Sequence, residues 1–144
     1  MQVSDNRCCF ICGPANPIGL KVKPSRDESA GRAWLSVVIP PEYQGWEGIA
    51  HGGIVAALLD EVSAYAGMAV SKQIVTAELN IRYLRPVPIG REVTIEAQVR
   101  EQVRRSVMVV ATMTCRGEVL ARSTGRMVVL KPVPGEVSPA TPIA

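Results

Sequence analysis

The hydrophobic positions of the chain are concentrated in one continuous run, from Ile54 to Val70. Apolar or aromatic residues fill 13 of these 17 positions, and the other four are Asp60, Glu61, Ser63 and Gly67. A surface helix carries an apolar stripe on one side only, whereas this run is apolar nearly all round. It therefore predicts a helix that is buried on most sides. Two adjacent carboxylates in its middle need an explanation, because taking a carboxylate out of water costs free energy.

The segments before and after this run have the features of β-strands. In "TAELNIRY" apolar and polar residues alternate, as they do in a half-buried strand. Two strands are predicted before the helix, in "LKVKPSRDESAGRAWLSVVIP", with a turn at "SRDESAG". Three more follow in "EVTIEAQVRE", "SVMVVATMTCRG" and "EVLARSTGRMVVLK", which are rich in β-branched residues. The order β-β-α-β-β-β-β predicts an α+β protein whose antiparallel meander covers the helix.

Length and charge narrow the class of protein. A chain of 144 residues, 47% hydrophobic, is the size of one compact domain. We expect an N-terminal loop segment over 1–18, the folded domain over 19–131 and a flexible C-terminal tail over 132–144. The net charge is only +3 and no dense Lys/Arg run is present, so no nucleic-acid partner is predicted. No signal peptide or membrane-spanning run is evident, which predicts a cytoplasmic protein with no membrane partner.

The spacing of the four cysteines is not typical of a disulfide-rich domain or of a four-cysteine zinc site. They are Cys8, Cys9, Cys12 and Cys115. Without a secretion signal, disulfides are not expected. Cys9 and Cys12 form a single CxxC, whereas a structural zinc site usually takes four ligands from two such pairs. The other candidate ligands are Cys8, His51 and Cys115, and adjacent cysteines rarely fit one tetrahedral site. We therefore expect small, partly buried thiols in the N-terminal loop, and no bound metal.

The two acids of the helix lie on different faces. Asp60 shares a face with Gly53, seven residues earlier, whereas Glu61 is rotated by about 100°. His51, Gly52 and Gly53 form the helix N-terminus, whose unpaired N–H groups can bind an oxyanion. Asp60 lies roughly 10 Å further along the axis, which suits a site shared between two subunits. An ion pair of Asp60 with an arginine is the structural alternative, but the combination of residues favours function.

The motif "HGGIVAALLDE", with its histidine nine residues before the aspartate, resembles the hotdog-fold acyl-CoA thioesterases of the phenylacetate-pathway type. "TAELNIRYLRPVPIG" is similar to the strand that follows the helix in that family, and "CFICGPANPIGL" to the N-terminal segment of one of its branches. The resemblance covers roughly residues 8–131. It implies a hotdog fold, a long helix wrapped by an antiparallel sheet, and active sites at a subunit interface. We expect a homo-oligomer, at least a dimer because an edge strand would otherwise stay exposed, with a dimer of dimers as the further expectation; the sequence does not distinguish dimer from tetramer.

The resemblance implies hydrolysis of an acyl-CoA thioester, with no cofactor beyond the coenzyme A of the substrate. Asp60 would act as general base or nucleophile, and the Gly53 N–H would polarise the thioester carbonyl. His51 is expected to orient the loop by hydrogen bonding more than to transfer a proton. Glu61 is a rival for the role of Asp60, because other hotdog thioesterases use a glutamate.

Two further positions match the family less closely. A polar residue before the histidine often positions water or the thioester, but the matching position is Gly45, and Gln44 is the nearest substitute. Thr76 matches a Ser or Thr that helps to hold water in some relatives. The alternation of the strand, however, places Thr76 on the face of Glu78 and Asn80, away from the apolar face.

The phosphates of coenzyme A require cations near the mouth of the site. Arg82 and Arg85 are the first candidates, with Arg104 and Arg105 next, although a solvated strand face explains all four equally well. A hydratase or dehydratase of acyl thioesters is an alternative within the fold, and a non-catalytic acyl-CoA-binding module is an alternative outside the enzymes. The acyl group itself is not indicated by the sequence.

Overall fold

The predicted order of strands and helix is confirmed in the computed structural model, which describes residues 1–131. The predicted tail, 132–144, lies outside the described residues. The elements are β1 (Ser25–Asp27), β2 (Arg32–Val38), the 3-10 helix η1 (Pro41–Tyr43), α1 (Gly52–Gly67), β3 (Ile74–Tyr83), β4 (Glu92–Val103), β5 (Ser106–Cys115) and β6 (Glu118–Val129). Among these residues, no helix is both long and apolar enough to cross a membrane.

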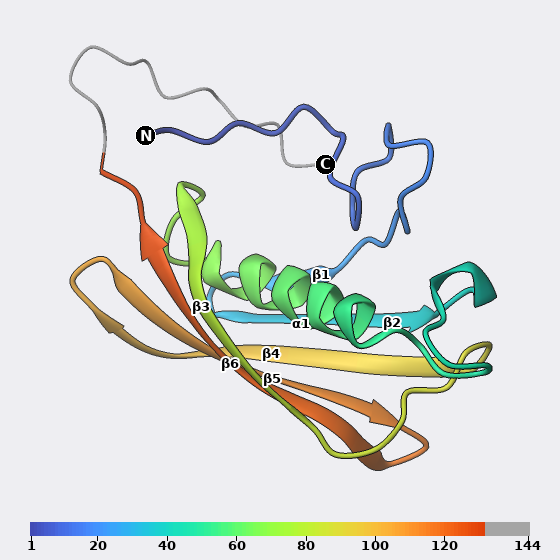
Figure 1. The fold of residues 1–144 in the computed structure, drawn as a ribbon. Coiled ribbons are helices and arrows are strands. Elements are labelled where there is room, and N and C mark those ends of the chain that lie inside the picture. The colour runs from blue at the N-terminus through green and yellow to red at the C-terminus, as the bar shows by residue number, and fades with distance from the viewer. Residues whose placement is uncertain (132–144) are drawn as a thin grey trace.

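The six strands form one antiparallel sheet in the order β1-β2-β4-β5-β6-β3. The sheet curves around α1, and the N-terminal segment lies on the side of the helix away from the sheet (Figure 1). The turn between β5 and β6 consists of Arg116 and Gly117, both with positive φ, 51° and 80°. Such left-handed pairs match the twist of a two-residue hairpin. The predicted α+β architecture is therefore present.

The first strand is displaced from its predicted place. The sequence predicted a turn over residues 25–31, but β1 occupies Ser25–Asp27, inside that range. The turn itself spans Glu28–Gly31 and is closed by the Gly31 N–H, which donates to the Glu28 carbonyl over 3.3 Å. Pro24 immediately precedes β1 and has no N–H for a ladder, so the pairing begins only after it.

Helix α1 begins at Gly52, as the predicted placement of His51, Gly52 and Gly53 at the helix N-terminus requires, and ends at Gly67, three residues before the end of the apolar run at Val70. His51 is its N-cap, and the imidazole Nδ1 accepts the Gly53 N–H over 2.8 Å. This bond satisfies one of the backbone donors that a helix leaves unpaired at its start, the role usually taken by Ser, Thr, Asp or Asn. The Tyr83 hydroxyl at the end of β3 donates to the Gly52 carbonyl over 2.8 Å. The beginning of the helix is thus tied to the strand that follows it.

The core lies between α1 and the inner face of the sheet. Leu58, Leu59 and Val62 are fully buried there, and burying each such side chain contributes roughly 1.5–3 kcal/mol. Near the end of the helix the backbone approaches the sheet closely, because a Cβ on Gly67 would lie 3.0 Å from Met127 Sδ. The strand residues of this core include Ala33 and Leu35 of β2, Val93, Ile95 and Ala97 of β4, Val107, Val109, Ala111 and Met113 of β5, and Ala121 and Met127 of β6.

The side of α1 away from the sheet is less buried than the sequence predicted. Ala57, Asp60, Glu61 and Ala64 are only partly buried. The N-terminal segment covers part of this side, around Glu61, and leaves the rest accessible. The alanines on this side are therefore small residues at a half-open surface and not parts of a closed core.

Strand β3 forms one edge of the sheet. It pairs with β6 on one side and, within residues 1–131, has no partner strand on the other. It is 10 residues long, whereas β1 at the opposite edge has three. A long edge strand exposes a row of unpaired N–H and C=O groups that favour pairing with another chain.

Candidate active site

Asp60 and Thr76 are brought together by the packing of α1 against β3. The Thr76 hydroxyl Oγ1 donates to Asp60 Oδ1 over 2.7 Å. Asp60 is half-buried on the helix, and Thr76 is exposed on the edge strand. Among the residues that the structure describes, none donates a hydrogen bond to Asp60 Oδ2. The carboxylate is therefore held through one oxygen, and the other can take a proton from water or attack an electrophile.

The expectation that Thr76 lies on the outer face with Glu78 is wrong, because β3 contains a β-bulge. Thr76 pairs with Met127 and Glu78 pairs with Arg126, so Ala77 is an extra residue of β3 without a partner of its own on β6. An extra residue shifts the phase of inward and outward side chains by one position. The hydroxyl of Thr76 consequently points toward Asp60.

A second group of predicted site residues gathers at the N-terminus of α1. His51 Nδ1 accepts the Gly53 N–H, so in the neutral imidazole Nε2 carries the hydrogen. Gly45 packs against His51, and a Cβ there would lie 3.2 Å from the His51 Cα. The side chain of Gln44 turns back into its own loop, where Oε1 accepts the Gly48 N–H over 3.2 Å. The His51 side chain thus caps the helix, and the Gln44 side chain closes the loop that precedes it.

The two groups lie apart within one protomer. Seven residues of helix separate Gly53 from Asp60, which is roughly 10 Å along the axis at 1.5 Å per residue. The hydrogen bonds of Thr76 and His51 keep each group in its own place. One thioester carbonyl cannot contact both the Gly53 N–H and the Asp60 carboxylate of the same chain.

Glu61 lies with the N-terminal loop and not with Thr76. Its carboxylate oxygens are 3.7 and 3.9 Å from the Cys9 Sγ. Burial raises the pKa of the Glu61 carboxyl; hydrogen bonds from Cys12 and Cys9 oppose this rise, and the charge of Asp60 adds to it. Burial also raises the pKa of the Cys12 thiol, and its hydrogen bond with Glu61 and that residue's charge add to the effect. Glu61 therefore contacts the N-terminal loop.

Substituting Glu61 by glutamine is expected to change the pH dependence of stability. A carboxyl whose pKa is raised in the folded state contributes stability below its ordinary pKa of 4.5 and loses it as pH rises through the folded value. In chelator-containing buffer, the Tm of Glu61→Gln should therefore increase relative to wild type as the pH is raised from 4 toward neutrality. Glu101→Gln, at a solvated position on β4, is the matched control. A constant Tm difference across this range would contradict the prediction.

The two arginines predicted first to bind the phosphates of coenzyme A, Arg82 and Arg85, do not line a common hollow. Arg82 is exposed on β3 and makes no ion pair within the described part of the chain. Arg85 Nε lies 3.6 Å from Glu118 Oε2, and both side chains are exposed. Arg85 also lines a hollow of about 440 Å³ together with Arg91 and Arg116. These three guanidinium groups make the end of the sheet where they lie cationic.

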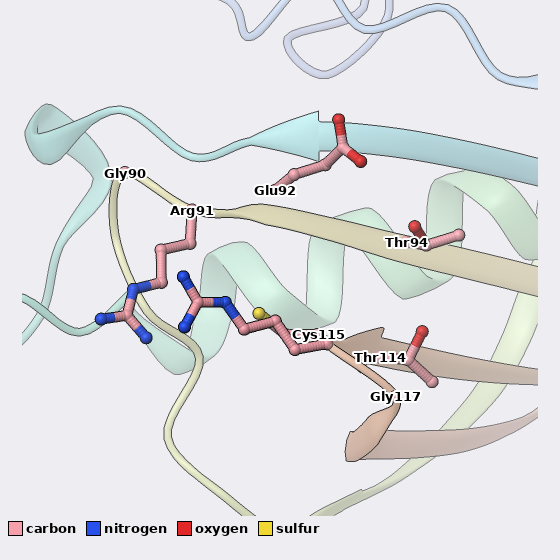
Figure 2. Close-up of a pocket in the computed structure, with 8 residues that line it drawn as sticks. Gly90, Arg91, Glu92, Thr94, Thr114, Cys115 and Gly117 are labelled. Carbon is pink, nitrogen blue, oxygen red and sulfur yellow. The ribbon is translucent and has the colours of Figure 1, made fainter.

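Arg91 and Arg116 were missed in the sequence, because only the fold brings them together. They also line an adjacent hollow of about 530 Å³, with Thr94 and Thr114 on strands β4 and β5 (Figure 2). The pairing of Thr94 with Thr114 places the beginning of β4 beside the end of β5. Both arginines stand in or next to turns, where sequence reasoning gave them no special role.

The family of the chain follows from comparison with known proteins. Residues 47–126, more than half of the chain, match the model of the thioesterase superfamily. The matched range contains both Asp60 and Thr76. The chain belongs to the thioesterase superfamily, and the predicted family resemblance is confirmed.

A curated relative supports the same family but is much longer. The chain is 30% identical over 87 residues to the acyl-coenzyme A thioesterase THEM5 of Mus musculus. The similarity covers 59% of this chain and 35% of the mouse protein. The chain thus spans about a third of the length of this relative.

Solved structures confirm the hotdog fold. A putative thioesterase from Ralstonia eutropha, described as phenylacetic acid degradation-related, is 26% identical with a TM-score of 0.71, over 81% of this chain and 90% of that one. A protein from Streptococcus mutans, solved bound to acetyl CoA, is 23% identical with a TM-score of 0.70, over 76% of this chain and 88% of that one. At that identity, the second likeness shows the fold alone.

Proposed function

We propose that this chain hydrolyses acyl-CoA thioesters to a free acid and coenzyme A. The observation that carries the proposal is the hydrogen bond of the Thr76 hydroxyl to Asp60, which leaves one carboxylate oxygen free at a half-open surface. Membership of the thioesterase superfamily supports it, as does similarity to a mouse acyl-coenzyme A thioesterase. The acetyl CoA in the Streptococcus mutans structure is the kind of ligand that such a site would take.

In the proposed reaction, Asp60 Oδ2 removes a proton from a water molecule as the water oxygen adds to the thioester carbonyl carbon. The tetrahedral intermediate then collapses and the carbon–sulfur bond breaks, so the thiolate of coenzyme A leaves and takes up a proton. In the nucleophilic variant, Asp60 attacks the carbonyl carbon itself and forms an anhydride, which water then hydrolyses. Thr76 holds the carboxylate in position in both variants.

The negative charge that develops on the carbonyl oxygen is placed at the N-terminus of α1, next to the Gly53 N–H. The helix dipole and a backbone donor there favour an oxyanion. His51 Nδ1 already accepts this N–H, so the carbonyl oxygen must share or replace that bond. His51 would thereby hold the donor in its direction until the substrate binds.

The donor and the base come from different subunits in this proposal. The separation of Gly53 from Asp60 within one chain, roughly 10 Å, excludes a common contact with one carbonyl group. The edge strand β3 carries Thr76 and, in the described part of the chain, lacks a partner on one side. Pairing of β3 with β3 of a second copy would cover this edge and bring a helix N-terminus toward Asp60 of the other chain.

The phosphates of coenzyme A are assigned to the cationic end of the sheet, where Arg85, Arg91 and Arg116 line one hollow. Guanidinium groups bind phosphate oxygens by two parallel hydrogen bonds. Glu118 already lies 3.6 Å from Arg85, so Arg91 and Arg116 are the stronger candidates. Arg82, which lines neither of the two hollows there, is the weaker one.

The test of this function is the release of free thiol from a panel of aliphatic and aromatic acyl-CoAs incubated with the full chain. Binding of the same compounds is measured separately by calorimetry. Turnover above the uncatalysed rate supports the proposal and identifies the acyl class. Acyl-CoA that binds without any thiol release would overturn it and leave a binding module. Release of a hydrated or dehydrated acyl-CoA instead of thiol would indicate the hydratase class.

Thr76→Val should lower kcat by about tenfold to a hundredfold, because a hydrogen bond to a charged group contributes roughly 1.5–3 kcal/mol. Valine keeps the shape of threonine and removes only the hydroxyl that donates to Asp60. Thr76→Ser keeps the hydroxyl and should retain most of the activity. KM should change little in either variant, since the role of Thr76 is to position the carboxylate. A rise in KM with unchanged kcat would contradict this assignment.

A further inference from the structure

A cluster of three potential metal ligands lies on the side of α1 away from the sheet. The Sγ atoms of Cys9 and Cys12 and a carboxylate oxygen of Glu61 all lie within 4.8 Å of one another. The two cysteines come from the N-terminal loop and the glutamate from the middle of the helix. We propose that Cys9, Cys12 and Glu61 bind one Zn²⁺ ion, which fastens the N-terminal segment to α1.

The distance between the Cys9 sulfur and the Glu61 carboxylate fits one edge of a tetrahedral zinc site. With Zn–S and Zn–O bonds of about 2.3 and 2.0 Å, a tetrahedron has S···O edges of about 3.5 Å and an S···S edge of about 3.8 Å. The Cys9 Sγ lies 3.7 and 3.9 Å from the two oxygens of Glu61. Shifts of a few tenths of an ångström would therefore place this sulfur and a carboxylate oxygen on one ion.

The loop that carries the cysteines is built around the first sulfur. The backbone N–H groups of Ile11 and Cys12 both point at Cys9 Sγ, over 3.4 and 3.5 Å. The two N–H groups fix the position of this sulfur, which lies 3.7 Å from Glu61 Oε2. The Gly13 N–H closes the turn on the Cys9 carbonyl over 2.8 Å. A Cβ on Gly13 would lie 2.4 Å from the Cys9 nitrogen, so a side chain there would force this turn open.

The cavity beside the three ligands leaves room for a fourth ligand. Cys9, Cys12 and Glu61 line one cavity of about 300 Å³, together with Arg26 and Lys72. Three protein ligands leave the fourth position of a tetrahedral ion open to this cavity, where water can occupy it. Two thiolates and one carboxylate around Zn²⁺ leave a net charge of −1. Arg7 and Lys72 line the same cavity, as do Asp5 and Arg26, and Arg26 is already paired with Glu28 over 3.1 Å.

The site is separate from the proposed catalytic pair. Glu61 is rotated by about 100° around the helix from Asp60. Cys8 is exposed and lies outside the cluster, which makes it the matched control for its neighbour Cys9. The zinc proposal can therefore fail or hold regardless of whether the chain hydrolyses acyl-CoA.

The test begins with the metal content of the purified full chain, measured by inductively coupled plasma mass spectrometry. We expect about one zinc per chain in wild type and in Cys8→Ser, and much less in Cys9→Ser, Cys12→Ser and Glu61→Gln. Metal-depleted wild type titrated with Co²⁺ should show sulfur-to-cobalt charge-transfer absorption. Each ligand variant should weaken Co²⁺ binding by more than about 100-fold, because changes in the outer shell alone cost 10–100-fold.

Three results would overturn the proposal. The first is wild type with neither zinc nor the cobalt absorption while all four cysteines titrate as free thiols. The second is a Cys9–Cys12 disulfide in the purified protein, detected by mass spectrometry, that persists when zinc is present. The third is Cys8→Ser losing metal as completely as Cys9→Ser, which would place the ion elsewhere.

Discussion

Asp60→Asn should lower kcat/KM for acyl-CoA hydrolysis by about two orders of magnitude or more, the usual scale for a lost general base. Asparagine has nearly the same shape, and its carbonyl oxygen can still accept the hydrogen bond from Thr76. The amide can neither take a proton from water nor attack a thioester. The fold and acyl-CoA binding should consequently persist while the chemical step is lost.

Two glutamate variants show whether the loss of activity is specific to the Asp60 carboxylate. Glu61→Gln removes the neighbouring carboxylate, which faces Cys9 and not Thr76. Glu101→Gln removes an exposed carboxylate far along β4 and should leave kcat/KM unchanged. Full activity in Asp60→Asn together with a large loss in Glu61→Gln would transfer the catalytic role to Glu61.

Leu59→Ala should lower the free energy of unfolding by about 2–5 kcal/mol, the range for removing a fully buried leucine side chain. Leu59 is 0% exposed between α1 and the sheet and directly precedes Asp60. The loss combines the removed apolar area with the cavity that remains when the surroundings relax only in part. Activity should fall with the fraction of folded protein and not with the chemical step.

Urea unfolding at a fixed protein concentration measures this effect, because association would otherwise change the apparent stability. Leu84→Ala is the matched control, since Leu84 is 45% exposed and loses less contact on truncation. Equal losses for Leu59→Ala and Leu84→Ala would contradict the assignment of Leu59 to the core.

The architecture followed from periodicity. The continuous apolar run predicted the helix, alternation predicted β3, and β-branched residues and turn signals predicted the other long strands. The predicted placement of His51, Gly52 and Gly53 at the start of the helix is confirmed, with His51 as the N-cap. The position of β1 was missed, because Pro24 delays the pairing of the first strand.

The site was less accessible to sequence reasoning, because it depends on tertiary contacts. Spacing and the family resemblance identified Asp60 and Thr76, but a β-bulge at Ala77 decides that their side chains meet. Glu61 was known to lie on another face of the helix. Its contact with Cys9 joins residues 52 positions apart, and no local pattern encodes such a contact.

A double-mutant cycle on kcat/KM with Asp60→Asn and Thr76→Val tests most directly whether the two residues act as one catalytic unit. If Thr76 acts only by holding the Asp60 carboxylate, its loss should cost nothing more once that carboxylate is gone. We therefore expect the double variant to be as active as Asp60→Asn alone. If kcat/KM of the double variant is instead lower than that of Asp60→Asn by the full factor lost in Thr76→Val, the two side chains act independently. That result would contradict the account.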